Sequence, residues 1–158
     1  HTVAQSLAHL LADAPHRLSE ADAFRKRTGY LPFIKHMQME PHLRMLLAHL
    51  RKHCKTAIAT NRTDTMERVL LEHDLEGCFD LVVSAADVTH PKPHPEQLHT
   101  IIDHFDVSPE TVCFIGDSDL DQQAAAAAGV PFIAFGNPDL PADAHIDRLD
   151  RVIDLLGH

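Results

Sequence analysis

Three carboxylates lie close together in the segment Gly-Asp-Ser-Asp-Leu-Asp at residues 116–121. Without a partner these charges would repel one another, so a cation is expected among them. Mg²⁺ fits the segment, because it takes oxygen ligands, usually one or two carboxylates together with substrate phosphate and water. Asp117 follows an apolar run and a glycine, and we expect it to ligate the ion. Asp119 is expected only to favour the N-terminus of the helix that follows.

Lys92 stands in the segment His-Pro-Lys-Pro-His-Pro at residues 90–95. Prolines on both sides restrict the backbone and limit the directions in which the ammonium can point. A held ammonium can neutralise the charge of phosphoryl oxygens, whereas a lysine in a stiff surface loop would simply be solvated. His90 and His94 also suggest a pair of metal ligands. The prolines exclude a helical i, i+4 spacing of these histidines, so the sequence argues against that site.

Thr60 and Asn61 follow a short apolar run that ends at Ala59. A hydroxyl and free backbone N–H groups at the end of a strand can bind the oxygens of an anion. The alternative is that Thr60 caps the next helix, which is a common role for threonine. The sequence leaves both roles open.

The apolar pattern places these polar residues directly after strands. Strands are expected at residues 56–59, 81–84, 112–115 and 131–135, and each precedes a helical pattern. Strands without strict alternation that are each followed by a helix indicate a three-layer α/β fold with a parallel sheet. Ligands of such sheets bind beyond the carboxyl ends of the strands. The candidate site therefore comprises residues 60–61, 84–87, 116–121 and 136–137.

The composition excludes several classes of protein. The chain has 158 residues, 44% of them hydrophobic, which is enough for a buried core. Its net charge of −9 argues against a nucleic-acid partner, which would need a basic face. No apolar run approaches the roughly 18 residues that a membrane span needs. Three widely spaced cysteines match no zinc pattern and predict reduced thiols in a cytoplasmic protein.

Taken in order, these motifs resemble those of the haloacid dehalogenase superfamily. The resemblance runs from about residue 40 to about residue 136. The helical front, residues 1–38, would be a remnant of the helical cap found in the phosphoglycolate phosphatase-like branch, and residues 39–158 would be the Rossmann-like α/β core. The motifs that carry the resemblance are Ala-Ile-Ala-Thr-Asn at 57–61, Lys92 between prolines, Phe-Ile-Gly-Asp-Ser-Asp-Leu-Asp at 114–121, and an alanine-rich helix that ends in Ala-Gly-Val at 128–130.

The resemblance implies a role for each candidate residue. Thr60, helped by the backbone of Asn61, would bind the transferring phosphoryl group, and Lys92 would pair with the phosphate and the nucleophile. Asp117 would ligate Mg²⁺, while Asp121 would orient Lys92 or a metal-bound water and is also a candidate metal ligand. The implied activity is Mg²⁺-dependent hydrolysis of a small phosphorylated metabolite through an aspartyl-phosphate. Two alternatives stay open: a phosphosugar mutase with the same parts, and a non-catalytic module that binds phosphate and Mg²⁺.

The family's nucleophile motif, Asp-x-Asp-x-Thr, does not precede Thr60 in this sequence. In the family, the strand that carries this motif lies in the centre of the sheet, between the strands that would end here at Thr60 and Gly116. Removing it would leave two rows of buried backbone groups without partners. We therefore expect the core to lack its first strand and the nucleophile to lie in a segment outside these 158 residues. Direct pairing of residues 56–59 with residues 112–115 would contradict this expectation.

Overall fold

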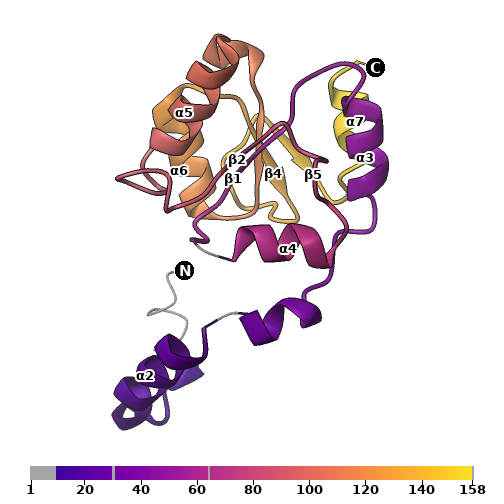
Figure 1. The fold of residues 1–158 in the computed structure, drawn as a ribbon. Helices are drawn as coiled ribbons and strands as arrows, with labels where there is room; N and C mark the ends of the chain where they lie inside the picture. Colours follow the sequence, from indigo (N-terminus) through magenta and orange to yellow (C-terminus); the bar gives the residue numbers. More distant parts are fainter. Residues whose placement is uncertain (1–9, 30, 64, 158) are drawn as a thin grey trace. The chain divides into compact units, whose positions relative to one another are not determined.

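The computed structural model describes residues 10–29, 31–63 and 65–157 and divides the chain into two compact units, His1–Met37 and Gln38–His158 (Figure 1). In the first unit, the helix α2 (Leu18–Thr28) follows a short 3₁₀ turn, and a second 3₁₀ segment, η2, spans Leu31–His36. Residues 1–9 of the predicted cap remnant lie outside the described residues. The assignment of this unit as a cap stays a prediction.

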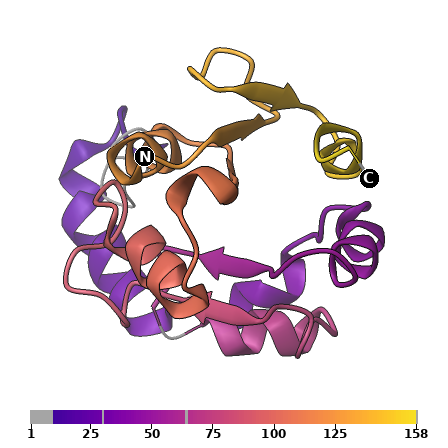
Figure 2. The same ribbon diagram turned by 90° about the horizontal axis from the view of Figure 1, so that it is seen from above.

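The second unit contains two sheets of parallel strands. β1 (Ala57–Ala59) pairs with β2 (Leu81–Val83), and a separate sheet has the order β3 (Phe114–Gly116), β4 (Phe132–Phe135) and β5 (Ala144–Ile146). Figure 2 shows the purple and magenta strands of the first pair apart from the orange to yellow elements that contain the second sheet. Among the described residues, β1 and β3 do not pair with each other. The direct pairing that would contradict an additional central strand is therefore not observed.

Helices cover the strands on both sides, which confirms the predicted three-layer α/β architecture. α5 (Glu96–Phe105) and α6 (Asp119–Ala128) contact each other and the strands on one side, and α3 (Leu43–Leu50) and α7 (Arg151–Leu155) contact each other on the other side (Figure 1). α4 (Met66–Glu72) connects β1 to β2. In the described part of the chain, no helix combines the length and the apolar character that crossing a membrane requires.

The alanine-rich helix α6 lies close to its sheet because its inward side chains are small. Ala124 and Ala125 are fully buried, in one cluster with Leu98 of α5 and Phe132 and Ala134 of β4. A larger side chain at either alanine would have to displace these neighbours. This packing fixes the N-terminal end of α6 beside the end of β3, where the candidate carboxylates lie.

Asp80 ties the beginning of β1 to the beginning of β2. Its carboxylate accepts hydrogen bonds from the backbone N–H of Thr56 and from Lys55 Nζ, both at 2.9 Å. The Thr56 N–H, and after it Lys55, hold the pKa of Asp80 below the usual aspartate value of about 3.9. A carboxyl with a lowered pKa in the folded state stabilises the fold above its unfolded pKa, and this contribution is lost as the pH falls through the folded pKa.

We therefore expect Asp80→Asn to lower the melting temperature at neutral pH and to reduce its dependence on acid. Between about pH 5 and about pH 3, the wild type should lose more thermal stability than the variant, because only the wild type has this carboxylate to protonate. Thermal unfolding followed by circular dichroism measures both effects, with the exposed Asp139→Asn as the control. Equal acid sensitivity of wild type and Asp80→Asn would contradict this role.

Candidate active site

Lys92 reaches from its loop to the end of β1 and to the first turn of α6, the helix that follows β3 in the other sheet. Its Nζ donates to the carbonyl oxygen of Ala59 at 2.8 Å and to Asp121 Oδ1 at 2.6 Å. The side chains of Lys92 and Asp121 are each only 10% exposed, and the Lys92 ammonium also lies 5.3 Å from the centre of the Phe114 ring. The alternative of a solvated lysine on a surface loop is therefore wrong. The ammonium is held by a short, charge-assisted hydrogen bond that water screens little.

Asn61 holds the backbone of the lysine segment. Its side-chain nitrogen donates to the carbonyl oxygen of Lys92 at 2.8 Å, and the Lys92 N–H donates to Asn61 Oδ1 at 3.1 Å. These two bonds link the end of β1 to the loop that carries the lysine. The sequence analysis considered only the backbone of Asn61, so this positioning role of the side chain was missed.

Asp121 is buried at the start of α6, and both of its carboxylate oxygens have partners. Oδ1 accepts from Lys92, while Oδ2 accepts from the Ser118 hydroxyl at 2.6 Å. The Asp121 N–H donates to Ser118 Oγ and the Ser118 N–H donates to Asp121 Oδ2, both at 3.3 Å, and these two bonds form a capping box. These contacts match the role of orienting Lys92. Metal ligation by Asp121 stays a prediction.

Gly116 allows Asp121 to lie against the end of β3. A Cβ atom built at residue 116 would lie 2.5 Å from Asp121 Cβ and 2.7 Å from Asp121 Cγ, well inside van der Waals contact. Asp121 has little room to retreat, because Lys92 and Ser118 hold its carboxylate. The close approach of Asp121 therefore explains why residue 116 is a glycine.

Asp117 directly follows β3, and its side chain is exposed to solvent. Its backbone carbonyl accepts a hydrogen bond from Asn137 Nδ2 at 3.1 Å, which fixes this turn to the loop after β4. Asp119 is the first residue of α6 and is also exposed, as expected of a residue that only favours the helix N-terminus. An accessible carboxylate beside an oxygen-rich helix start provides the donors that Mg²⁺ prefers.

Thr60 continues β1 and does not cap the next helix. Its N–H donates to the carbonyl oxygen of Val83 at 3.0 Å, and its hydroxyl accepts from the N–H of Arg62 at 3.2 Å. The N-cap position of α4 is Thr65, so the helix-cap alternative for Thr60 is wrong. Binding of a phosphoryl oxygen by Thr60 stays a prediction.

Gln97 supports Thr60 from within the core, and the sequence analysis missed it. Its side chain is fully buried in α5, and its Nε2 donates to the carbonyl oxygens of Thr60 at 2.8 Å and Val83 at 3.4 Å. Buried polar groups are retained mainly where they satisfy other buried polar groups. A glutamine directly before the apolar residues of α5 was the only signal that could have revealed it.

The turn after β2 forms a closed network of its own. The Asp87 carboxylate accepts from the Ser84 hydroxyl at 2.6 Å and from the Ser84 N–H at 2.7 Å. The Ser84 hydroxyl, followed by its backbone N–H, lowers the pKa of Asp87. The Asp87 carboxylate therefore stabilises the turn after β2, although the sequence analysis had included it among the candidate site residues.

A cavity of about 320 Å³ lies at the opposite ends of β1 and β2. It is lined by residues that precede these strands, among them Lys52, Cys54 and Cys78. All three cysteines of the chain are free, and burial raises the pKa of the Cys54 thiol, which disfavours the reactive thiolate. None of the residues gathered around Lys92 lines this cavity.

Comparison with known proteins decides the family. The pattern of haloacid dehalogenase-like hydrolases matches residues 12–135. The chain belongs to this family. A crystal structure of a haloacid dehalogenase (HAD)-superfamily hydrolase of subfamily IA from Geobacter sulfurreducens superposes with a TM-score of 0.85 at 36% identity, covering 99% of this chain and 74% of that chain. The Rossmann-like fold expected from the motifs is thereby confirmed.

Curated relatives place this HAD-family chain in the phosphoglycolate phosphatase-like branch. A phosphoglycolate phosphatase from Photorhabdus laumondii is 34% identical over 129 residues, which cover 73% of this chain and 55% of that protein. A phosphoglycolate phosphatase from Salmonella typhi is 35% identical over 105 residues, which cover 58% of this chain and 42% of that protein. The chain thus spans about half the length of these relatives.

Proposed function

We propose that this chain supplies the phosphate- and Mg²⁺-binding part of a phosphatase active site that acts on a small phosphorylated metabolite. The observation that carries the proposal is the buried ion pair of Lys92 with Asp121, together with an exposed carboxylate, Asp117, directly after β3. A fixed cation and a metal-binding carboxylate at one sheet edge are what phosphoryl transfer requires. Membership of a hydrolase family and similarity to proteins named phosphoglycolate phosphatases support the same activity.

In this proposal each residue has a separate task. Asp121 holds the Lys92 ammonium in place, and Lys92 neutralises charge on the phosphoryl oxygens as the bond to the leaving group breaks. Thr60 and the Asn61 backbone bind a further phosphoryl oxygen, and Asp117 holds the metal. Mg²⁺, when bound, offsets negative charge on the transferring group.

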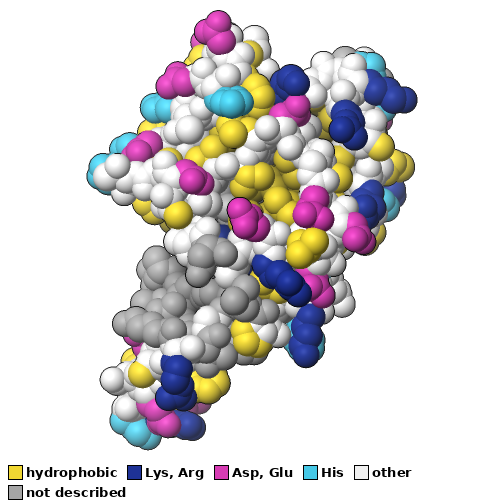
Figure 3. All heavy atoms as spheres, in the orientation of Figure 1, with side chains coloured by type: hydrophobic (Ala, Val, Ile, Leu, Met, Phe, Trp, Pro, Cys, Tyr) yellow, Lys and Arg dark blue, Asp and Glu magenta, His cyan; other side chains and the backbone are white. Residues whose placement is uncertain are grey.

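We place a further strand between β1 and β3, which belong to separate sheets. Both of these strands are only partly buried, whereas the first three residues of β4 are buried. Apolar side chains gather on the visible face of this unit between α5 and α6 on one side and α3 and α7 on the other (Figure 3). An edge strand presents unpaired backbone groups that can accept another strand.

We assign this position to a strand with the sequence Asp-x-Asp-x-Thr. Residues 39–158 would then be the core without its first strand, and residues 1–38 the remnant of the cap. Lys92 already spans from Ala59 at the end of β1 to Asp121 after β3, which would set its ammonium beside a nucleophile on the inserted strand. That aspartate would attack phosphorus and expel the alcohol, and water would then hydrolyse the resulting aspartyl-phosphate.

The function is tested by measuring the release of inorganic phosphate from p-nitrophenyl phosphate. The assay compares these 158 residues alone with a chain in which an Asp-x-Asp-x-Thr strand precedes them. With the strand present, we expect turnover that a chelator abolishes. Phosphate release separates a hydrolase from a phosphosugar mutase, which keeps the phosphoryl group on the sugar. Mg²⁺-dependent phosphate binding without turnover, even with the strand present, would instead identify a non-catalytic binding module.

The metal role of Asp117 has a matched control in the same turn. Asp117→Asn should raise the Mg²⁺ concentration needed for half-maximal activity by about 10- to 100-fold, because a ligand is lost. Asp119→Asn, which changes another exposed carboxylate at the start of α6, should leave this concentration nearly unchanged. Equal effects of the two substitutions, or full activity in the presence of chelator, would contradict the assignment.

A further inference from the structure

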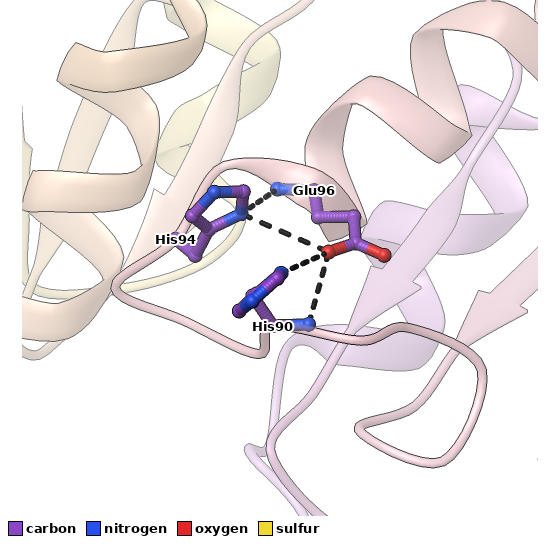
Figure 4. A group of neighbouring side chains, drawn as sticks. All are labelled: His90, His94 and Glu96. Carbon is purple, nitrogen blue, oxygen red and sulfur yellow. Dashed lines mark hydrogen bonds and ion pairs between the residues drawn. The ribbon is translucent and has the colours of Figure 1, made fainter.

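His90, His94 and Glu96 form a cluster outside the proposed active site (Figure 4). One potential ligand atom from each of the three side chains lies within 4.8 Å of the others. His90 Nδ1 lies 3.1 Å and His94 Nδ1 lies 3.9 Å from Glu96 Oε2, and the centres of the two imidazole rings are 4.8 Å apart. Both imidazoles thus face the same carboxylate oxygen.

The backbone holds the Glu96 carboxylate in position for this contact. The N–H groups of Thr89 and His90 donate to its two oxygens at 2.8 Å and 2.9 Å. The Glu96 N–H in turn donates to His94 Nδ1 at 3.3 Å, which keeps that ring over the start of α5. Hydrogen bonds that fix the orientation of a carboxylate are typical of metal ligands. The Nδ1 lone pair of His94 accepts the Glu96 N–H, so His94 would bind a metal through Nε2 or after release of that bond.

We propose that His90, His94 and Glu96 bind a divalent transition metal of the Zn²⁺ class. Two imidazole nitrogens with one carboxylate oxygen is a ligand set that suits Zn²⁺ and not Mg²⁺, which prefers oxygen ligands alone. Ligands bonded to tetrahedral Zn²⁺ at 2.0–2.1 Å stand about 3.3 Å apart, so side chains whose ligand atoms already lie within 4.8 Å of one another would close on the ion by rotation. Water could supply a fourth ligand, because the His90 and His94 side chains are 64% and 51% exposed.

The sequence argument against these histidines excluded only a helical pair. The structure brings them together through a loop instead, and a glutamate beyond the last proline completes the set. The same loop carries Lys92, whose N–H and carbonyl oxygen are held by Asn61, while the Glu96 carboxylate holds the backbone N–H groups of Thr89 and His90. A metal that joins His90 and His94 to Glu96 would add a stronger link on the Glu96 side of the loop and brace Lys92.

Titration of the protein with Co²⁺ tests the site directly. Four-coordinate Co²⁺ absorbs visible light more strongly than the hydrated ion, so binding is read without any enzyme assay. We expect saturable binding that Zn²⁺ displaces and excess Mg²⁺ does not. His90→Gln combined with His94→Gln should weaken it by at least about tenfold, since two ligands are lost.

Matched controls separate this site from the other histidines and from the active site. His99→Gln combined with His104→Gln changes two exposed histidines of α5 and should leave Co²⁺ affinity unchanged. Asp117→Asn should also leave it unchanged, so the outcome does not depend on the phosphatase proposal. Unaltered Co²⁺ binding in the His90/His94 variant, or its loss in Asp117→Asn, would overturn the assignment.

The proposed bracing of Lys92 is tested separately, by hydrogen–deuterium exchange. Zn²⁺ should slow deuterium uptake at residues 88–95 in the wild type and not in the variant that lacks both histidines. Uptake that is the same with and without Zn²⁺ would overturn the bracing part of the proposal.

Discussion

Lys92→Met is expected to lower kcat/KM for phosphomonoester hydrolysis by about 10²- to 10³-fold, the range seen when one fixed donor to a developing negative charge is removed. The ammonium lies 2.6 Å from Asp121 and is only 10% exposed, so solvent does not replace it easily. Methionine keeps most of the side-chain volume and removes the charge. The reaction is measured with Mg²⁺ in excess, with the Asp-x-Asp-x-Thr strand present, so that the loss reports on the lysine alone.

Two further variants make this result specific. Lys52→Met removes a charge at the cavity on the opposite ends of β1 and β2 and should leave kcat/KM nearly unchanged. Lys92→Arg keeps the charge, but a larger planar guanidinium is not expected to reproduce both bonds of the ammonium, to Ala59 and to Asp121, so partial activity is expected. Thermal unfolding of each variant separates loss of chemistry from loss of fold. A folded Lys92→Met protein with wild-type kcat/KM would contradict the role of the ammonium.

The candidate residues could be selected from the sequence by their chemical types, and their functional roles stay predictions. A cluster of carboxylates after a glycine, and a lysine between prolines, are visible in the sequence without any knowledge of contacts. The residues that contact them could not be predicted from the sequence. The bond from Lys92 to Ala59 O joins residues that are distant in the chain, and only the folded sheet brings them together.

The strands were predicted where an apolar run marks them. The expected strand at residues 131–135 is observed as β4, and that at 81–84 as β2, each within one or two residues. β5 was not predicted, because it is short and has a histidine at its centre. It is ordered by pairing with β4 and by the hydrogen bond from the Phe132 N–H to the Asp143 carboxylate at 2.8 Å. Context of this kind overrides local propensity.

Gly116→Ala is the substitution from which we expect the largest loss of stability at the site, about 1–3 kcal/mol in the free energy of unfolding, as for other overpacked positions. The new methyl group would meet Asp121 Cβ at 2.5 Å, Cγ at 2.7 Å and Oδ2 at 2.9 Å. Moving Asp121 away would lengthen its bonds to Lys92 and Ser118, so the strain should also lower activity. Urea unfolding measures the first effect and phosphate release the second.

A double-mutant cycle identifies the clash as the cause. In an Asp121→Gly background the contacts of the new methyl group with Cβ, Cγ and Oδ2 are all gone, so Gly116→Ala should destabilise the protein less than it does in the wild type, with a coupling energy of about 0.5–3 kcal/mol. Gly77→Ala is the control for the loss of glycine itself: it introduces a methyl group with no atom within 4 Å, at a φ of +67° that disfavours other residues. Its effect should be the same in both backgrounds. If the effect of Gly116→Ala is also independent of Asp121, the loss of stability arises in the strand, and the close approach of α6 to β3 is not what requires a glycine here.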